Sequence, residues 1–178
     1  MTARRVLQLG AGERRLDAAG DTIVRVDLRA DVKPDVVWNL DQAPWPLDDS
    51  SFDVIDATDV IEHLADVVRV MEEIHRVARP NALVRIVTPH FSSSNSFTDP
   101  THRQHLGLFS FDYFTGGNQW GFYSRARFAK KRADIFFTPS FCNKVVWRLA
   151  RRWPELWERR FAWTFPAWFM SFELEAVK

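Results

Sequence analysis

The stretch from Val6 to Asp27 constrains the fold more than any other part of the chain. It begins with an apolar run, turns at Gly10 and Gly12, and ends in a second apolar run that closes on Asp27. Because glycine lacks a Cβ, the backbone can turn sharply there and lie against a ligand. In open α/β sheets, ligands bind beyond the carboxyl ends of the strands, where an acidic residue can accept hydrogen bonds from ribose hydroxyls. The pattern predicts two strand tips that hold a nucleoside-containing ligand.

The spacing of the glycines narrows the choice of ligand. A dinucleotide fingerprint has a third glycine three residues after the second, and Arg15 stands at that position. This argues against a pyrophosphate and favours an adenosyl ligand without one, such as S-adenosylmethionine (SAM). A G-x-G turn also occurs at ordinary strand-to-helix turns, so the other motifs have to decide between these interpretations.

The rest of the chain alternates between strand and helix patterns. Strands are expected near 4–9, 22–27, 35–40, 54–57 and 83–87. A sixth strand ends in A-D-I-F-F near 137, and a last strand covers 169–177. Helices are expected near 60–68, 66–78 and 143–163, the last broken at Pro154. This alternation predicts an α/β fold, a Rossmann-like doubly wound sheet with mostly parallel strands, an antiparallel C-terminal strand and helices on both faces.

Length and composition fit one domain. With 178 residues and a hydrophobic fraction of 46%, the chain can bury a substantial core. We expect a single domain over 1–178, with a SAM-binding half at 1–90, a substrate or lid loop at 91–122 and C-terminal strands with a basic helix at 123–178. The single cysteine excludes an internal disulfide framework. No apolar leader or membrane span is recognisable, so a cytoplasmic location is expected.

Charge is distributed unevenly along the chain. Residues 1–122 carry 12 Lys and Arg against 18 Asp and Glu, whereas residues 123–178 carry 12 against 5. The basic, tryptophan-rich segment 143–163 can be an amphipathic cover over the sheet, a contact with a membrane surface, a nucleic-acid contact or a homodimer face. Nucleic acid is not expected as a partner, because no separate RNA-binding domain is present.

Four motifs, in order, resemble those of the class I SAM-dependent methyltransferases, in particular the small methyltransferase domain 11-like group. They are L-Q-L-G-A-G, V-D-L, D-Q-A-P-W-P-L-D-D-S-S-F-D, and A-T-D-V-I-E-H-L followed by E-E-I-H-R-V-A-R-P-N. The resemblance implies an enzyme that transfers a methyl group from SAM to an O or N atom of a small polar metabolite or saccharide. Gln8 and Arg14 depart from the family pattern, which has an acidic residue and a third glycine there. The alternative is a non-catalytic Rossmann-like module that binds a partner or membrane through its Trp/Arg-rich helix.

The same resemblance implies which residues bind SAM. They stand at the expected strand tips and are Gly10, Ala11, Gly12, Asp27, Leu28, Asp41, Gln42 and Thr58. Gly10 and Gly12 would border the methionine part, and Asp27 would hold the ribose hydroxyls. Asp41 and Gln42 would face the adenine, and Thr58 would lie beside the sulfonium.

Histidines and a carboxylate gather in the loop after the fifth strand, namely His90, Asp99, His102 and His105. Polar residues on a loop held by a rigid sheet often carry function, and methyl transfer to oxygen or nitrogen usually needs a base. We therefore predict His90, His102 and Asp99 as catalytic residues of the substrate pocket.

Other interpretations of these histidines stay open. Two His and a carboxylate resemble ligand sets for zinc or non-haem iron, although we predict no metal. The segment from Asp99 to His102 can also be a capped turn whose imidazole bonds to the backbone. Glu62 and His63 are expected to form a helix cap with a surface histidine.

Overall fold

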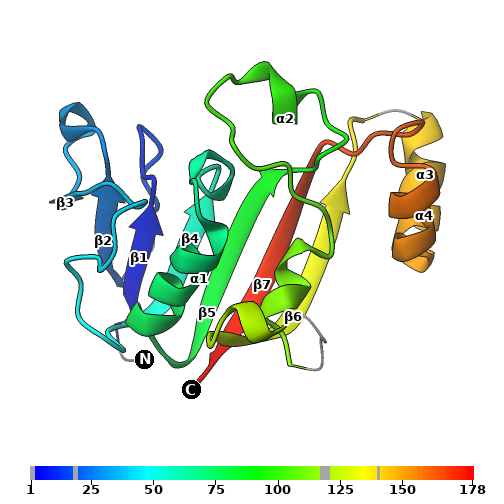
Figure 1. Cartoon of the computed structure of the whole chain (residues 1–178). Coiled ribbons are helices and arrows are strands. Elements are labelled where there is room, and N and C mark those ends of the chain that lie inside the picture. Colours follow the sequence, from blue (N-terminus) through cyan, green and yellow to red (C-terminus); the bar gives the residue numbers. More distant parts are fainter. Residues whose placement is uncertain (1–2, 18–19, 117–120, 140) are drawn as a thin grey trace.

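The computed structural model describes residues 3–17, 20–116, 121–139 and 141–178, without the side chains of residues 121 and 141–143. Seven strands form one sheet in the order β3-β2-β1-β4-β5-β7-β6 (Figure 1). Their bounds are Arg5–Leu9 (β1), Thr22–Asp27 (β2), Val36–Val37 (β3), Phe52–Thr58 (β4), Ala78–Pro89 (β5), Arg127–Phe136 (β6) and Phe169–Val177 (β7). In this order, the neighbouring strands from β3 through β2, β1 and β4 to β5 pair in parallel. Strand β7 runs antiparallel to both β5 and β6. The predicted sheet with an antiparallel C-terminal strand is confirmed.

Among the residues that the structure describes, four α-helices and four 3-10 turns connect the strands. The α-helices are α1 (Val67–Val77), α2 (Asn95–Thr98), α3 (Phe141–Arg152) and α4 (Pro154–Arg160). The 3-10 turns are η1 (Ala30–Val32), η2 (Ile61–His63), η3 (Ser110–Phe114) and η4 (Gly121–Tyr123). Asp66 is the N-cap of helix α1, and its side chain accepts a hydrogen bond from the backbone N–H of Arg69 at 3.0 Å. The predicted helix pair broken at Pro154 is confirmed by α3 and α4.

The predicted helix over residues 60–68 is wrong, because only the short turn η2 forms there. Asp59 has a left-handed backbone with φ 55°, and Leu64 is extended, so neither end can continue a helix. The carbonyl of Glu62 instead accepts the backbone N–H groups of Arg103 and Gln104, at 2.7 and 3.0 Å. The segment after β4 is therefore fastened to the lid loop rather than wound into a helix.

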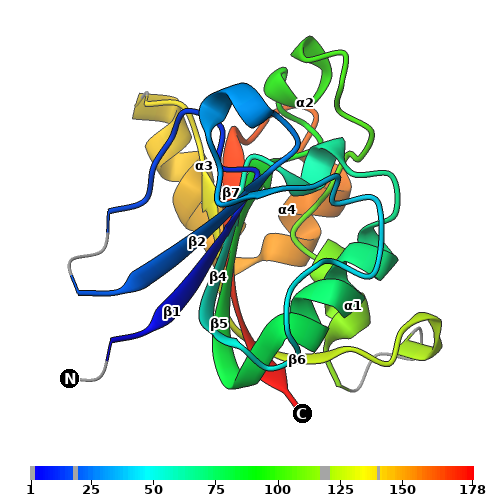
Figure 2. The ribbon, with the colours of Figure 1, turned by 90° about the vertical axis from the view of Figure 1, so that its left-hand side faces the viewer.

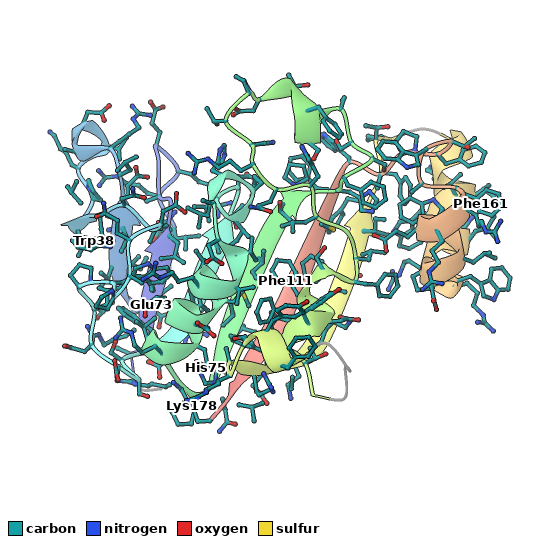
Figure 3. The ribbon with its side chains drawn as sticks, in the orientation of Figure 1. Trp38, Glu73, His75, Phe111, Phe161 and Lys178 are labelled. Atoms are coloured by element: carbon teal, nitrogen blue, oxygen red, sulfur yellow. The ribbon has the colours of Figure 1, made fainter. Side chains whose placement is uncertain are left out.

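The main core lies between the sheet and the helices on one of its faces. Met71 and Ile74 of α1 pack there with buried strand residues such as Ile55 and Ile86. Phe111 of η3 meets Phe172 of β7 with ring centroids 4.8 Å apart, and Figure 3 labels it in front of the sheet. Figure 2 shows α1 and α2 on this side of the sheet and α3 on the other. Helices thus occur on both faces, but unevenly.

The connections between the first strands are short. The described residues between β1 and β2 form turns and irregular backbone, and only η1 lies between β2 and β3. The carboxyl ends of the parallel strands meet at the edge that lies under α2 in Figure 1. Within the described ranges, no helix is long and apolar enough to span a bilayer.

Candidate functional site

Asp27 ties together the tips of β1 and β2. Its Oδ2 accepts the backbone N–H of Gly12 at 2.7 Å, and its Oδ1 accepts that of Arg29 at 2.8 Å. The residue is only 8% exposed. The structure therefore brings Asp27 to the glycine turn, as the sequence suggested. Each carboxylate oxygen keeps a further lone pair, so binding of ribose hydroxyls stays a prediction.

The two glycines of the turn have different surroundings. Both have positive φ, +56° at Gly10 and +50° at Gly12. A Cβ on Gly10 would lie 2.6 Å from Val60 Cγ2, whereas a Cβ on Gly12 would meet no described atom within 4 Å. Gly10 is therefore required by packing, and Gly12 has the open side that a ligand can approach. Ala11 between them is buried, and its N–H donates to the carbonyl of Val26 at 3.3 Å.

Gln8 and Arg14, the two departures from the family pattern, have clear structural roles. Gln8 Nε2 donates to the carbonyl of Arg14 at 2.7 Å, and its Oε1 accepts the N–H of Leu16 at 3.3 Å. A carboxylate could not make the first of these bonds, because it has no hydrogen to donate. Arg14 pairs with Asp56 at 2.9 Å, and Thr58 donates its hydroxyl to the same carboxylate at 3.0 Å. Together these contacts hold the segment that replaces a first helix.

Asp41 joins three segments near the strand tips. Its Oδ1 accepts the N–H of Ala65 at 2.8 Å, and its Oδ2 lies 3.5 Å from Nη1 of Arg103 in the lid loop. Gln42 is exposed and uses its carbonyl to accept the indole N–H of Trp38 at 2.9 Å. Leu28 is 66% exposed. The predicted contacts of Asp41, Gln42 and Leu28 with a cofactor remain predictions.

A polar pocket of about 500 Å³ lies beyond the ends of β4 and β5. Its lining includes Asp59, Glu62 and His63 from the segment after β4, and Asp99 and His102 from the lid loop. One ligand-type atom from each of Glu62, His63 and His102 lies within 4.8 Å of the other two. The two imidazole rings meet edge to face, with centroids 4.6 Å apart. Burial raises the pKa of the Glu62 carboxyl and lowers that of the His63 imidazole.

The lid loop fixes the orientation of both histidines. His102 Nδ1 lies 3.3 Å from the carbonyl of Ser96, and His63 Nδ1 lies 2.9 Å from the hydroxyl of Thr101. That hydroxyl donates to Asp99 Oδ1 at 2.7 Å, and the N–H of Thr101 donates to the same oxygen at 2.8 Å. These hydrogen bonds from Thr101 lower the pKa of Asp99. The expected capped turn from Asp99 to His102 is present, and it also faces the pocket.

His90 does not fit its predicted role as a catalytic base. It is fully buried and is not among the described residues that line the pocket. Its Nδ1 accepts the N–H of Ser92 at 3.1 Å, and its Nε2 therefore donates to Glu158 Oε1 at 3.2 Å. Both ring nitrogens therefore have partners within the protein, and His90 joins the start of the lid loop to α4. A role as the base stays a prediction, and this geometry does not support it. His105 also lies apart from the cluster, with Nδ1 2.8 Å from the hydroxyl of Ser96 and its ring stacked on Phe97.

The sequence interpretation missed the pocket roles of Asp59, Glu62 and His63. The sequence predicts a helix cap at Glu62 and His63, yet these residues and Asp59 follow β4 directly in the run D-V-I-E-H. The carboxyl ends of β4 and β5 meet at the same edge of the sheet, so this run and the lid loop had to be neighbours. That topological argument was the signal that could have found them.

Comparisons with known proteins agree with this geometry. Residues 7–86 match the family described as the methyltransferase domain. The match covers a little under half of the chain, and over these residues the chain is similar to that family. The matched residues include the glycine turn, Asp27, Glu62 and His63. The lid loop and all residues after it lie outside the match. No curated protein matches the sequence significantly.

Several solved structures with the same fold are described as SAM-dependent methyltransferases. One from Archaeoglobus fulgidus is 18% identical, with a TM-score of 0.68 over 97% of this chain and 86% of that chain. Another from Mesorhizobium loti is 15% identical, with a TM-score of 0.63 over 97% and 91%. The Haemonchus contortus phosphoethanolamine N-methyltransferase 2, solved with SAM, is 14% identical, with a TM-score of 0.59 over 99% of this chain and 49% of that chain. These structures confirm the predicted fold, and the family match over residues 7–86 is consistent with the predicted resemblance to the class I SAM-dependent methyltransferases.

Proposed function

We propose that this methyltransferase domain moves a methyl group from SAM to an O or N atom of a small polar metabolite or saccharide. The observation that carries the proposal is the continuity of the glycine turn with the polar pocket. Val60 packs against Gly10, and its neighbours Asp59, Glu62 and His63 line the pocket. A cofactor at the turn and an acceptor in the pocket would therefore lie on two sides of one short segment.

The residues of the turn fit an adenosyl cofactor. The open side of Gly12 leaves room for it, and the remaining lone pairs of Asp27 suit ribose hydroxyls. Thr58 stands at the end of β4, directly before Asp59 of the pocket. Bound SAM supplies a methyl carbon made electrophilic by a positively charged sulfur. The contribution of the chain is to hold an acceptor atom next to that carbon, which can supply several kcal/mol by proximity.

The pocket suits a polar acceptor rather than an apolar one. Its lining combines three carboxylates and two imidazoles with the amide of Asn95. His102 uses Nδ1 on the Ser96 carbonyl, which leaves the Nε2 lone pair able to take a proton. Asp99 acts through Thr101 on the orientation of His63. We therefore retain His102 as a candidate base and assign Asp99 a positioning role.

Calorimetric titration with SAM tests the cofactor half of this proposal. Asp27→Ala should weaken SAM binding by about 1–3 kcal/mol, the usual loss for a hydrogen bond to a charged group. Asp17→Ala is the matched control, because it removes an exposed carboxylate from the same region. Circular dichroism checks that both variants fold. Wild-type protein without affinity at millimolar SAM, or equal affinities for the two variants, would reject the proposed cofactor site.

A specific surface favours the membrane as a second partner. The hairpin of α3 and α4 carries a groove lined only by apolar side chains among the described residues, namely Val145, Val146, Leu149, Trp153, Leu156, Trp157, Phe161 and Phe165. Leu149, Trp153 and Leu156 are each about half exposed, and Figure 3 shows Phe161 at the far edge of the sheet. Six Lys and Arg against two Glu occupy residues 141–168. Exposed Trp and Leu beside arginines suit the interface of an anionic bilayer.

Vesicle co-sedimentation tests this contact. Wild-type protein should sediment with phosphatidylserine-containing vesicles more than with neutral vesicles. Leu156→Asp should abolish the difference, whereas Val37→Asp, which alters an equally exposed apolar residue on β3, should not. Concentration-dependent dimerisation without vesicle binding would instead assign the groove to a second copy. Vesicle binding by a protein that lacks SAM affinity would support the non-catalytic alternative.

A further inference from the structure

We propose that Glu62, His63 and His102 bind a divalent transition-metal ion that holds a hydroxyl acceptor. Glu62 and His63 lie on η2 directly after β4, and His102 lies on the lid loop after β5. The fold thus brings ligand-type atoms from two distant segments within 4.8 Å of one another. Two imidazoles and one carboxylate with open positions form a set that suits zinc, iron or cobalt better than magnesium.

The carboxylate of Glu62 provides an independent pointer to a cation. Glu62 is only 2% exposed, and its Oε2 makes no hydrogen bond of ordinary geometry among the described residues, although the buried Thr88 hydroxyl acts to lower the pKa of the carboxyl. Burial of a carboxylate oxygen is costly when its hydrogen bonding is this incomplete. A cation bound between Glu62 and the two histidines would remove that cost.

The hydrogen bonds of the two histidines leave Nε2 of each ring available to bind a metal. The Ser96 carbonyl can only accept, so His102 carries its proton on Nδ1 and has a lone pair on Nε2. The single hydroxyl hydrogen of Thr101 goes to Asp99, so Thr101 must accept the Nδ1 proton of His63. His63 therefore also has a lone pair on Nε2. Metal-binding histidines generally have this arrangement, in which the second ring nitrogen donates to a carbonyl or hydrogen-bonded oxygen.

The pocket leaves space for an acceptor on the metal. Only three of its lining residues form the cluster, and the volume of about 500 Å³ is also lined by Asn95 and Thr98. A metal-bound hydroxyl loses its proton more readily than a free one. In the transfer, which rests on the function proposed above, the acceptor oxygen forms the new bond to the methyl carbon and the carbon–sulfur bond breaks with its electron pair on sulfur. With the metal bound, Nε2 of His102 is a ligand and not the base considered above, so the hydroxyl proton leaves to water. Because the metal promotes loss of a hydroxyl proton, the site favours oxygen over nitrogen acceptors.

Titration of chelator-treated full-length protein with Co²⁺ tests the site without SAM. Wild-type protein should bind one Co²⁺ per chain, with visible absorption bands from nitrogen and oxygen ligands, and Zn²⁺ should displace it while Mg²⁺ should not. Thr101→Val should weaken Co²⁺ binding about 10–100-fold by releasing His63, and Glu62→Gln and His102→Ala should weaken it more. His105→Ala is the matched control in the same loop and should bind like wild type.

A second measurement guards against variants that only fold poorly. Zn²⁺ should raise the melting temperature of the wild type and of His105→Ala, but not that of Glu62→Gln. The absence of Co²⁺ binding to the wild type, or equal losses in Glu62→Gln and His105→Ala, would overturn the metal site. SAM calorimetry on the same samples separates the two proposals, because SAM binding without Co²⁺ binding rejects the metal site alone.

Discussion

Replacing Gly10 by alanine tests the close contact between the glycine turn and Val60. Gly10 has φ +56°, and an added Cβ would lie 2.6 Å from Val60 Cγ2 and 2.8 Å from Val60 Cβ. The left-handed backbone alone costs a non-glycine residue about 1–2 kcal/mol. Forcing a methyl group into a filled space adds roughly 1–3 kcal/mol. Gly10→Ala should therefore lower the free energy of unfolding by about 2–5 kcal/mol.

Gly12→Ala is the natural control for this substitution. Gly12 has nearly the same φ, +50°, but no described atom within 4 Å of the added Cβ. Only the backbone cost of about 1–2 kcal/mol should apply. The difference between the two variants thus measures the contact with Val60, separately from the strain of the turn.

Urea unfolding followed by tryptophan fluorescence gives both free energies. The double variant Gly10→Ala/Val60→Ala should recover part of the loss, because the shorter side chain removes the clash. A coupling energy of at least about 0.5–1 kcal/mol is expected for residues in direct contact. Equal destabilisation of the two glycine variants, or no coupling with Val60, would refute the packing argument for Gly10.

Two further predictions concern contacts that hold the sheet and the lid. The pKa of Asp53 lies below its ordinary value of 3.8, because its carboxylate accepts the N–H of Arg5 and pairs with Arg79. This carboxylate stabilises the fold above pH 3.8 and loses that effect as the pH falls through its lowered pKa. Asp53→Asn should therefore make the free energy of unfolding fall less steeply with decreasing pH in the acid range. An unchanged pH dependence of that free energy contradicts this prediction. Glu158→Ala leaves the N–H of Leu108 and the ring of His90 without their acceptor, and should cost about 1–3 kcal/mol in urea unfolding. Glu158→Gln keeps an acceptor oxygen and should cost less, and a reversed order would disprove the role given to this residue.

Much of the fold could be predicted from the chain because its strands carry strong local patterns. β2 and β7 have the expected bounds, and the helix pair breaks at Pro154 as expected. The failure at residues 60–68 has a different cause. Apolar residues recur there at helical spacing, but the carbonyl of Glu62 bonds to the lid loop 41 and 42 residues further along. Such a long-range partner overrides local periodicity and leaves no trace in the segment itself.

The candidate site was only partly predictable for the same reason. His102 and Asp99 reach the pocket, since the lid loop follows β5 at the functional edge. His90 follows β5 directly as well, yet the acceptor that fixes it is Glu158, which comes from α4. Glu62 and His63 looked like a cap because their partner His102 is remote in sequence. Residue type and local position identified the polar chemistry, and tertiary contacts decided which of those residues share a pocket.

The short connections and the charged strands have one common explanation. Crossover helices usually bury both faces of a parallel sheet, which makes its strands almost wholly apolar. Here little helix lies before β4, and the strands toward the other edge alternate instead. Arg85 of β5 and Arg132 of β6 both stand opposite Glu173 of β7, with 3.9 Å between Arg85 Nε and Glu173 Oε1. Such cross-strand charge pairs are compatible with water on that face. Where such charged pairs face water, the strands do not need a covering helix.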